Sequence, residues 1–294
     1  MSVRESLKKL QTDWMDILYP HWWDHTTPIE EIMDSLHILV EQGKTLYLGI
    51  SDTPAWVVSA ANTYARCQGK TPFSIYQVRW NALLRDFERE IIPMARHFGM
   101  ALAPWDALGG GKLKRKEEIE QRKARGEGLR SILSPEKSED EAQMSAALEK
   151  VADEHGNTLL TAVAFAYVMA KSPNAFPLVG GRKVENLRDN IQALNLRLTK
   201  KQMEFLGSQT PFYIGFPGNF IGPDPKVTGK ASFLLAANAN YDFVQGPRSI
   251  TSPEEARVLK LRNVSFWLAR LRGYILLYKI IYNKPVLKLL RKKL

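Results

Sequence analysis

The sequence lacks the features that mark secreted, cysteine-metal and membrane-spanning proteins. Cys67 is the single cysteine among 294 residues, which excludes an internal disulfide and a metal site built from cysteines. A reducing compartment is therefore the default, and we expect a cytoplasmic protein. No apolar run reaches the roughly 18 residues that a membrane-spanning helix needs. The charged segment Met1–Leu10 has the pattern of an amphipathic helix and lacks that of a signal peptide.

Acidic residues are absent from the last 38 positions, where Arg257–Leu294 carries eleven lysines and arginines. From totals of 41 basic and 31 acidic side chains, residues 1–256 are left with 30 and 31, a net charge of −1. The overall charge of +10 thus belongs to the tail, and the neutral body gives no case for nucleic-acid binding.

Five short apolar runs predict strands that are buried on both faces, as in a parallel sheet. They are Met15–Tyr19, Leu46–Ile50, Ser74–Gln77, Met100–Ala103 and Phe176–Val179. The first four begin about 26 to 31 residues apart, which is the length of one β/α unit.

Helical periodicity fills the intervals between these runs, and Gly43 and Gly99 mark two helix ends. The predicted helices are Ile29–Val40, Ala55–Tyr64, Phe87–His97, Glu139–Glu154, Leu160–Lys171, Val184–Leu194 and Lys200–Leu206. A basic loop over Gly109–Glu127 and an irregular segment over 207–250 complete the pattern.

Strands and helices that alternate at this period indicate a (β/α)₈ TIM barrel or an open doubly wound sheet. No Gly-x-Gly-x-x-Gly follows the first strand, which disfavours the dinucleotide-binding form of the open sheet. A closed barrel needs eight strands and we identify five, so we expect an incomplete barrel that lacks about 90 residues at its N-terminus. Residues 1–250 would form this partial barrel, and 251–294 a basic amphipathic extension.

Polar residues follow the first three predicted strands, where the chemistry of parallel barrels is located. His21 could donate a hydrogen bond to a carbonyl oxygen, or it could be a structural histidine packed between tryptophans. Ser51 and Asp52 could hold a ligand amide, or they could cap the following helix. Gln77 could also bind an amide.

Two glycine turns are candidate phosphate sites. After the fourth strand, Trp105 could stack on a flat ring and Gly109–Lys112 could wrap a phosphate chain; the alternative is a flexible surface loop. After the fifth, Gly180–Lys183 leads into a helix and so favours an anion. Arg182 there suits a phosphate monoester, although a solvated basic cap is the alternative.

Together these segments are similar to the aldo-keto reductases, most closely to the fungal aryl-alcohol dehydrogenase group that includes the norsolorinic acid reductases. The stretches that carry the resemblance are LQTDWMDILYPHWWD, VEQGKTLYLGISDTPAWVVSAAN, RDFEREIIPMARHFGMALAPWDALGGGK and FPLVGGRKVENLRDNIQAL. The resemblance runs from residue 2 to about 245.

The resemblance implies an aldo-keto reductase barrel that transfers hydride from NADPH to an aldehyde or ketone, in fungal aryl-alcohol or secondary metabolism. In the cofactor site that the resemblance implies, the nicotinamide carboxamide would be held by Ser51, Asp52 and Gln77, and Trp105 would stack on the nicotinamide ring. The pyrophosphate would be lined by Asp106, Leu108, Gly110 and Lys112. The adenosine 2′-phosphate and the adenine would be held by Gly180, Arg182, Asn186, Asp189 and Asn190. His21 would orient the substrate carbonyl.

The sequence departs from the family pattern at two places. The family's catalytic Asp, Tyr and Lys have no counterpart here, so only His21 of that set is present and the activity of an N-terminally truncated chain is in doubt. A catalytically inactive protein that binds nucleotide or acts as a scaffold is therefore the alternative function. The basic extension beyond residue 250 is also foreign to the family; 257–294 could contact anionic membrane weakly or have no partner.

A charge reversal at Arg182 tests the predicted cofactor. Because the guanidinium would bind the 2′-phosphate that distinguishes NADP(H) from NAD(H), Arg182→Glu should lower the preference for NADP(H). Titration of a full-length homologue with both cofactors measures this preference, and an unchanged ratio would show that the assignment is wrong.

Overall fold

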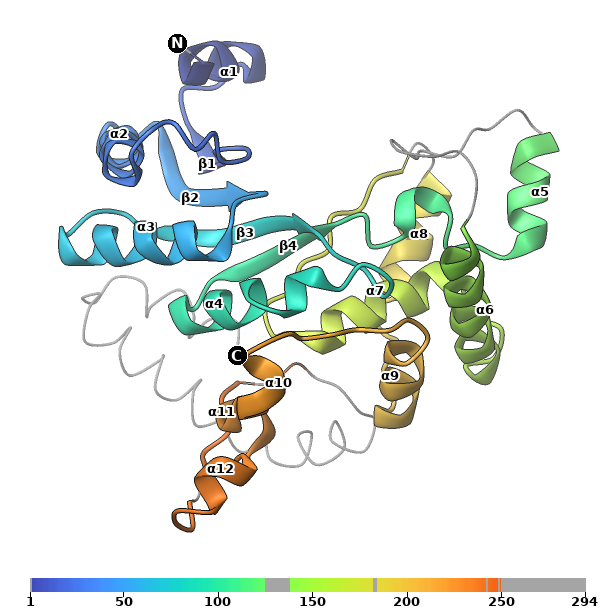
Figure 1. The fold of residues 1–294 in the computed structure, drawn as a ribbon. Helices are drawn as coiled ribbons and strands as arrows, with labels where there is room; N and C mark the ends of the chain where they lie inside the picture. Colours follow the sequence, from blue (N-terminus) through green and yellow to red (C-terminus); the bar gives the residue numbers. More distant parts are fainter. Residues whose placement is uncertain (1, 125–137, 182–183, 242, 248, 250–294) are drawn as a thin grey trace, which may run out of the picture. The chain divides into compact units, whose positions relative to one another are not determined.

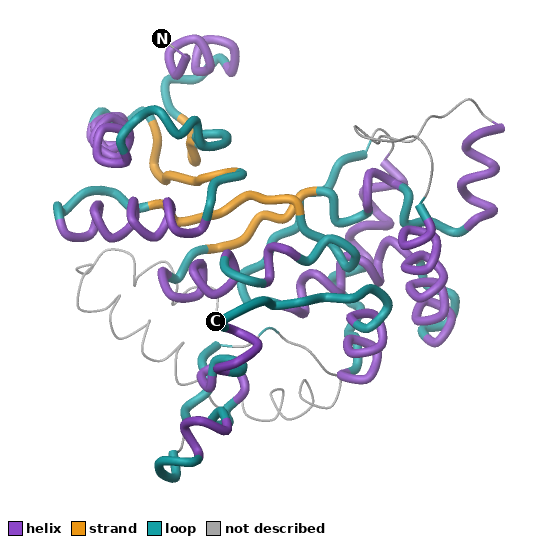
Figure 2. The backbone as a smooth tube through the Cα atoms, in the orientation of Figure 1, coloured by secondary structure: helices purple, strands orange, loops and turns teal. Residues whose placement is uncertain are grey.

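A computed structural model describes residues 2–124, 138–181, 184–241, 243–247 and 249. Its sheet contains four parallel strands, β1 (Met15–Leu18), β2 (Thr45–Ser51), β3 (Phe73–Arg79) and β4 (Ala101–Trp105), which pair in chain order. Helices lie between successive strands, as Figure 1 shows, and the alternation is easily followed in Figure 2. The α/β class and the first four predicted strands are therefore confirmed, and the four strands curl as half of a barrel.

The predicted fifth strand, Phe176–Val179, is wrong as a strand. Its chain runs beside β4 and makes one isolated bridge, Leu102 with Ala175. Backbone N–H groups of Phe176 and Leu178 donate to the carbonyls of Leu102 and Pro104, both at 2.8 Å. The next bridge would need an N–H from Pro104, which has none, so the ladder stops there. The described part of the chain thus holds four strands of the expected five.

The helices largely follow the predicted ranges. They are α1 (Ser2–Leu10), α2 (Ile29–Glu41), α3 (Ala55–Cys67), α4 (Ile91–Phe98), α6 (Glu139–Glu154), α7 (Leu160–Lys171), α8 (Val184–Gln192) and α9 (Lys200–Gly207). Gly43 and Gly99 take left-handed backbone at two helix ends, as expected of glycine. In the part of the chain that is described, no helix is long and apolar enough to cross a bilayer.

Three predicted segments differ from the structure. The helix expected over 87–97 is divided into the 3₁₀ turn η1 (Asp86–Glu88) and α4. Pro93 explains the break, because in a helix from residue 87 it would lack the N–H that bonds to Arg89. The basic loop holds η2 (Gly109–Gly111) and α5 (Lys116–Ala124), and the irregular segment holds α10 (Gly218–Ile221), α11 (Pro225–Thr228) and α12 (Phe233–Ala236).

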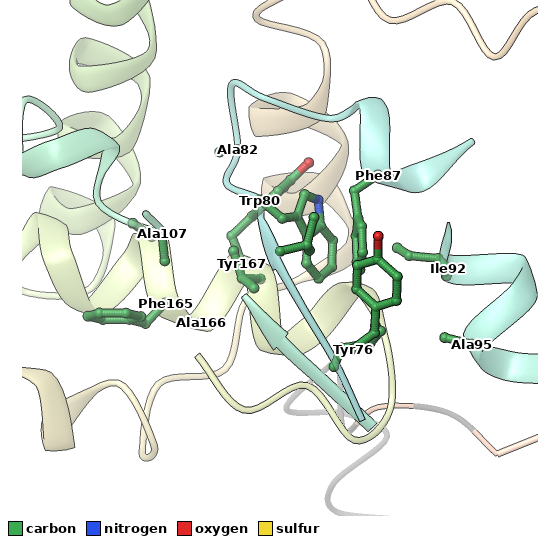
Figure 3. Close-up of a cluster of buried hydrophobic side chains, with 14 of the residues drawn as sticks. Tyr76, Trp80, Ala82, Phe87, Ile92, Ala95, Ala107, Phe165, Ala166 and Tyr167 are labelled. Carbon is green, nitrogen blue, oxygen red and sulfur yellow. The ribbon is translucent and has the colours of Figure 1, made fainter. Parts of the chain in front are cut away.

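One face of the sheet, the outer face, packs against the helices. The paired residues Ile50, Tyr76 and Leu102 form a row across β2, β3 and β4, and each is about 1% exposed. The rings of Tyr76 and Trp80 lie 6.0 and 5.1 Å from that of Phe87, within the cluster drawn in Figure 3. Such aromatic packing holds β3 against η1 and α4.

The opposite face, called the inner face, carries the alternate residues. Because paired residues of parallel strands share a face, Ser51 and Gln77 lie in one inner row and Arg79 and Trp105 in the next. Gly49 belongs to this face too, and the ring of Tyr19 lies directly over it. The inner face therefore presents polar and aromatic groups at the carboxyl ends of the strands.

A methyl group at Gly49 should disturb this arrangement. Its carbon would lie 2.8 Å from Cζ of Tyr19 and closer to two other ring atoms, so the ring would have to move. We expect Gly49→Ala to lower the free energy of unfolding by about 1–3 kcal/mol, the usual cost of overpacking.

Urea unfolding measures this loss, with Gly207→Ala as the control. A methyl group there would make an ordinary contact of 3.6 Å with the Tyr167 hydroxyl, within helix α9. Equal stability of the two variants would contradict the close approach of Tyr19 to Gly49.

Candidate functional site

The chain beyond β1 brings His21 to the end of β2. His21 forms an isolated parallel bridge with Ser51. The Ser51 N–H donates to the Pro20 carbonyl at 3.2 Å, and the Trp22 N–H donates to the Ser51 carbonyl at 3.1 Å. These bonds extend the β1–β2 pairing past the strands, so His21 and Ser51 lie side by side as the candidate site requires.

A hydrogen bond joins His21 to Asp52. His21 Nε2 lies 3.2 Å from Asp52 Oδ2, and the imidazole side chain is 67% exposed. Since an ionised carboxylate only accepts hydrogen bonds, Nε2 is the donor. The exposure of the side chain excludes a histidine buried between tryptophans, and the hydrogen bond to Asp52 orients the imidazole.

The turn after β2 is held by Tyr76. The hydroxyl of Tyr76 accepts a hydrogen bond from the Thr53 N–H at 2.9 Å and donates to the Thr53 carbonyl. Burial raises the pKa of this phenol to about 12; the hydrogen bond that the hydroxyl accepts from the Thr53 N–H lowers it, and nearby Asp52 raises it. Helix α3 begins after Pro54 without a side-chain cap, so the alternative in which Ser51 or Asp52 caps this helix is wrong.

Gln77 lies on the inner face beside Ser51, and its side chain hydrogen-bonds Tyr19. Burial raises the pKa of Tyr19, against the opposing effect of that bond. Sequence reasoning did not identify Tyr19 as part of the site. The signal was its place two residues before His21, at the end of an apolar run.

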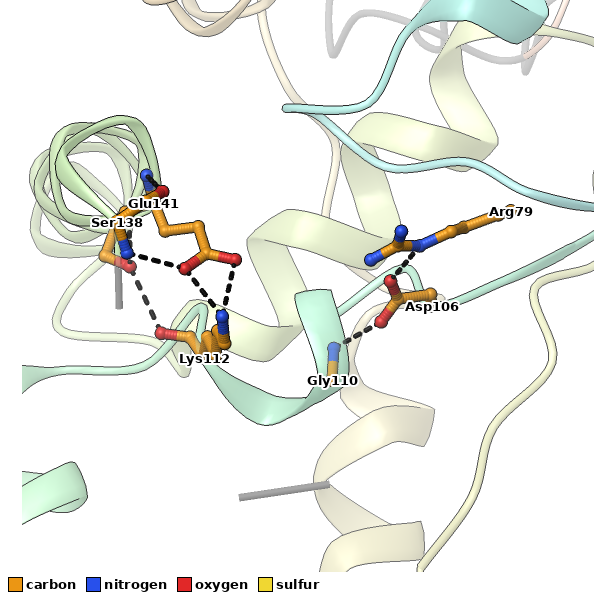
Figure 4. Close-up of polar contacts among 7 residues, drawn as sticks. Arg79, Asp106, Gly110, Lys112, Ser138 and Glu141 are labelled. Atoms are coloured by element: carbon orange, nitrogen blue, oxygen red, sulfur yellow. Dashed lines mark hydrogen bonds and ion pairs between the residues drawn. The ribbon is translucent and has the colours of Figure 1, made fainter. Parts of the chain in front are cut away.

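Arg79 contacts both Trp105 and Asp106 at the ends of β3 and β4, and Figure 4 shows its ion pair with Asp106. Its Nε donates to Asp106 Oδ2 at 2.7 Å, and Cζ lies 5.7 Å from the centre of the Trp105 ring. The Asp106 side chain is only 7% exposed, so the carboxylate of this ion pair is shielded from water, while the Arg79 side chain is 39% exposed. No local pattern singles out Arg79, because its partners Trp105 and Asp106 are 26 and 27 residues away in the sequence.

The glycine loop after β4 is ordered by Asp106. Its carboxylate accepts a hydrogen bond from the Gly110 N–H, and its carbonyl accepts one from Asn81 Nδ2 at 2.9 Å. Asp106 and the three glycines have positive φ, and the half-buried Leu108 packs on the core. The loop thus forms a turn over Gly109–Gly111, with Gly110 outside the helical range of φ and ψ.

Lys112, at the end of this loop, faces α6. Its Nζ lies 3.1 and 3.0 Å from the two carboxylate oxygens of Glu141, and its side chain is 7% exposed. Glu141 also accepts from the Ser138 N–H in the capping box of α6 (Figure 4). A role of Lys112 on a pyrophosphate stays a prediction that requires an exchange of partners.

The remaining predicted residues form a second group on and before α8. Gly180 and Asn186 are exposed, and Asp189 and Asn190 are half-buried. Arg182 and the basic segment 257–294 lie outside the described residues. The residues at the strand ends, Ser51, Asp52, Gln77 and Trp105, offer hydroxyl, amide and carboxylate oxygens, an amide NH₂ and a flat ring. This set fits an aromatic amide such as nicotinamide.

Substitution of Tyr76 should have a pH-dependent effect on stability. The folded-state pKa is raised from 10.0 to about 12, so the stability that the neutral phenol contributes is complete below pH 10. It is lost as the pH rises through 12. Tyr76→Phe should cost about 1–3 kcal/mol near pH 8 because Thr53 loses buried hydrogen bonds.

Urea unfolding from pH 8 to 11.5 checks this prediction. The difference between the unaltered chain and Tyr76→Phe should shrink above pH 10, while Tyr47→Phe, at a tyrosine that is 57% exposed, should behave like the unaltered chain. A pH-independent difference would show that the Tyr76 hydroxyl does not hold the turn.

Comparison with known proteins places this site in a family. The family model described as "Aldo/keto reductase family" matches residues 1–208. A relative in Saccharomyces cerevisiae, named "Probable aryl-alcohol dehydrogenase AAD4", is 64% identical over 244 residues, which are 83% of this chain and 74% of that protein. "Aryl-alcohol dehydrogenase [NADP(+)]" of Phanerodontia chrysosporium is 54% identical over 220 residues, 74% of this chain and 57% of that protein.

A solved structure is also similar to this chain. The crystal structure of a thermostable aldo-keto reductase in complex with the inhibitor epalrestat matches with a TM-score of 0.56 and 25% sequence identity. The match covers 71% of this chain and 65% of that one. With the family model, the relatives and the parallel β/α units in agreement, this chain belongs to the aldo-keto reductase family.

Proposed function

We propose that this chain binds NADP(H) on its inner face and serves the interconversion of an aldehyde or ketone with its alcohol, with aryl compounds as the substrate class. One observation carries the proposal. Ser51, Gln77 and Trp105 lie on the same face at the carboxyl ends of three adjacent parallel strands, and His21 is bridged to Ser51. The printed names of the relatives, one of them NADP(+)-dependent, support the cofactor and the substrate class.

The residues at the strand ends would each make a distinct contact with the nicotinamide. The Ser51 hydroxyl and the Gln77 amide can donate and accept, and the Asp52 carboxylate can accept, so together they complement a carboxamide. The Trp105 ring would stack on the nicotinamide ring. When bound, the reduced cofactor supplies the hydride; the protein positions it and excludes water.

The nucleotide end would extend along the loop after β4 and onto α8. Asp106, Leu108, Gly110 and Lys112 would line the pyrophosphate, and Gly180, Arg182, Asn186, Asp189 and Asn190 would hold the adenosine. Positive φ and the missing side chain at Gly110 let backbone approach a phosphate closely. The exposed imidazole of His21 would hydrogen-bond the substrate carbonyl oxygen through its Nε2–H, which donates to Asp52 before substrate binds.

A nucleotide-binding protein without turnover is the second candidate. Tyr19 is a phenol on the inner face close to the candidate site, and its hydroxyl is engaged by Gln77. Burial raises the pKa of Tyr19, which makes it a weaker proton donor to a carbonyl oxygen. This observation favours binding over catalysis by the 294 residues alone.

Calorimetric titration with NADPH, together with NADPH consumption in the presence of an aryl aldehyde, separates the candidates. Binding with turnover supports the reductase, and binding without turnover supports the nucleotide-binding role. A chain that binds no NADPH would contradict both. We expect binding with little turnover, because general acid catalysis contributes ~10²–10⁴-fold and the family's tyrosine has no counterpart here.

Substitution of His21 tests whether its imidazole faces the substrate carbonyl or the cofactor. In a chimera that begins with the first barrel units of the Saccharomyces relative, His21→Ala should lower turnover by about 10²-fold, since the imidazole would face the carbonyl. The NADPH dissociation constant should change by less than about twofold. His97→Ala on α4 is the control. If His21→Ala weakened NADPH binding as much as it lowered turnover, the imidazole would belong to the cofactor site.

A further inference from the structure

We propose that Arg79 is an additional nucleotide-binding residue, and that its guanidinium holds a phosphate of the cofactor's pyrophosphate. The inference rests on the proposed NADP(H) site and adds a residue that the family resemblance did not supply. Arg79 is the last residue of β3, two positions beyond Gln77 and on the same inner face. Its paired residue on β4 is Trp105, so it lies between the proposed ring contact and the glycine loop.

The guanidinium is anchored through one edge only. Nε donates to Asp106 Oδ2 at 2.7 Å. Among the described residues, neither Nη1 nor Nη2 has a hydrogen-bond acceptor, and the side chain is 39% exposed. Figure 4 draws no interaction between either terminal nitrogen and the other residues shown. Two Nη groups offer a planar fork of N–H donors, the geometry with which arginine binds phosphate oxygens.

Two contacts hold this fork in place before any ligand binds. The Asp106 carboxylate is fixed by the Gly110 N–H, and the Trp105 ring lies 5.7 Å from the guanidinium carbon. A side chain that is already ordered loses less conformational entropy on binding than a free arginine, whose rotamer entropy is worth roughly 2 kcal/mol. Arg79 is therefore preorganised for an anion.

A purely structural ion pair would look different, as Arg85 shows. Arg85 uses Nε and Nη2 on Glu88, both at 2.9 Å, and Nη1 on the Gly207 carbonyl at 2.8 Å. Its side chain is 11% exposed, and every edge of its guanidinium has an acceptor. In Arg79 the corresponding donors face no protein acceptor in the described part of the chain, so an external anion is the natural occupant.

Charge balance points to the pyrophosphate. Asp106 lies at the start of the glycine loop, and its negative charge would repel a phosphate there. The ion pair with Arg79 cancels that charge, while the unused Nη donors attract the phosphate oxygens. The glycines at 109–111 have positive φ and no side chains, so their backbone can approach such a group closely.

The test is calorimetric titration of the full chain and its variants with NADPH and with NADH. Arg79→Gln should weaken both cofactors by about 10- to 100-fold, since a hydrogen bond to a charged group is lost and the pyrophosphate is common to both. Arg79→Lys should cause an intermediate loss of affinity. Lysine keeps the positive charge, but its ammonium lacks the planar set of N–H donors with which arginine can bind Asp106 and a phosphate together. Arg66→Gln is the matched control: Arg66 also lies over an aromatic ring, that of Phe98, and donates to one carbonyl, but from α3.

Arg79→Gln leaves the buried Asp106 carboxylate without its cation, so the double variant Arg79→Gln/Asp106→Asn keeps the test valid if the single variant unfolds. The double variant should recover thermal stability but not cofactor affinity. Unchanged affinity for both cofactors in a folded variant would overturn the role of Arg79, and a loss confined to NADPH would do so too, because it would place Arg79 at the 2′-phosphate. If the unaltered chain binds neither cofactor, the proposed function fails and this inference fails with it.

Discussion

The site depends on one constraint: along each paired strand of the parallel sheet, successive side chains point to opposite faces. Ile50, Tyr76 and Leu102 are buried on the outer face by the helices. Their immediate neighbours in sequence must then point inward, which places Ser51, Gln77 and Ala103 in one row. A slip of one residue in any strand would send its polar residue into the core and an apolar residue into the site. Packing of the outer face therefore specifies the inner one.

Two aspartates complete the site, each directly after a strand. Asp52 follows β2 and Asp106 follows β4, and both have positive φ, at 46° and 61°. Left-handed backbone is tolerated by aspartate better than by most residues, and it turns the chain sharply at the strand end. The Asp52 side chain then reaches His21 in the segment after β1, and the Asp106 side chain reaches Arg79 at the end of β3. The same local conformation thus sets the orientation of an imidazole and of a guanidinium.

Much of the fold could be predicted because its signals are local. Apolar runs located β1 to β4, and glycines located helix ends such as that of α4 at Gly99. The prediction of a fifth strand was wrong for a local reason that the sequence contains: its neighbour β4 has a proline at position 104. The candidate residues at the strand ends were also foreseen from position. Their partners were not: Tyr19 with Gln77, Arg79 with Asp106 and Lys112 with Glu141 are contacts between separate elements, and no periodicity in the sequence reports them.

We propose that the inner face, at the carboxyl ends of β2, β3 and β4, is a dinucleotide site. A crystal structure of the chain with NADP⁺ would show where the cofactor binds. We expect the carboxamide within hydrogen-bond distance of Ser51 and Gln77, with the nicotinamide ring stacked on Trp105. A dinucleotide bound elsewhere, with these three side chains unchanged and uncovered, would show that the inner face is not the site.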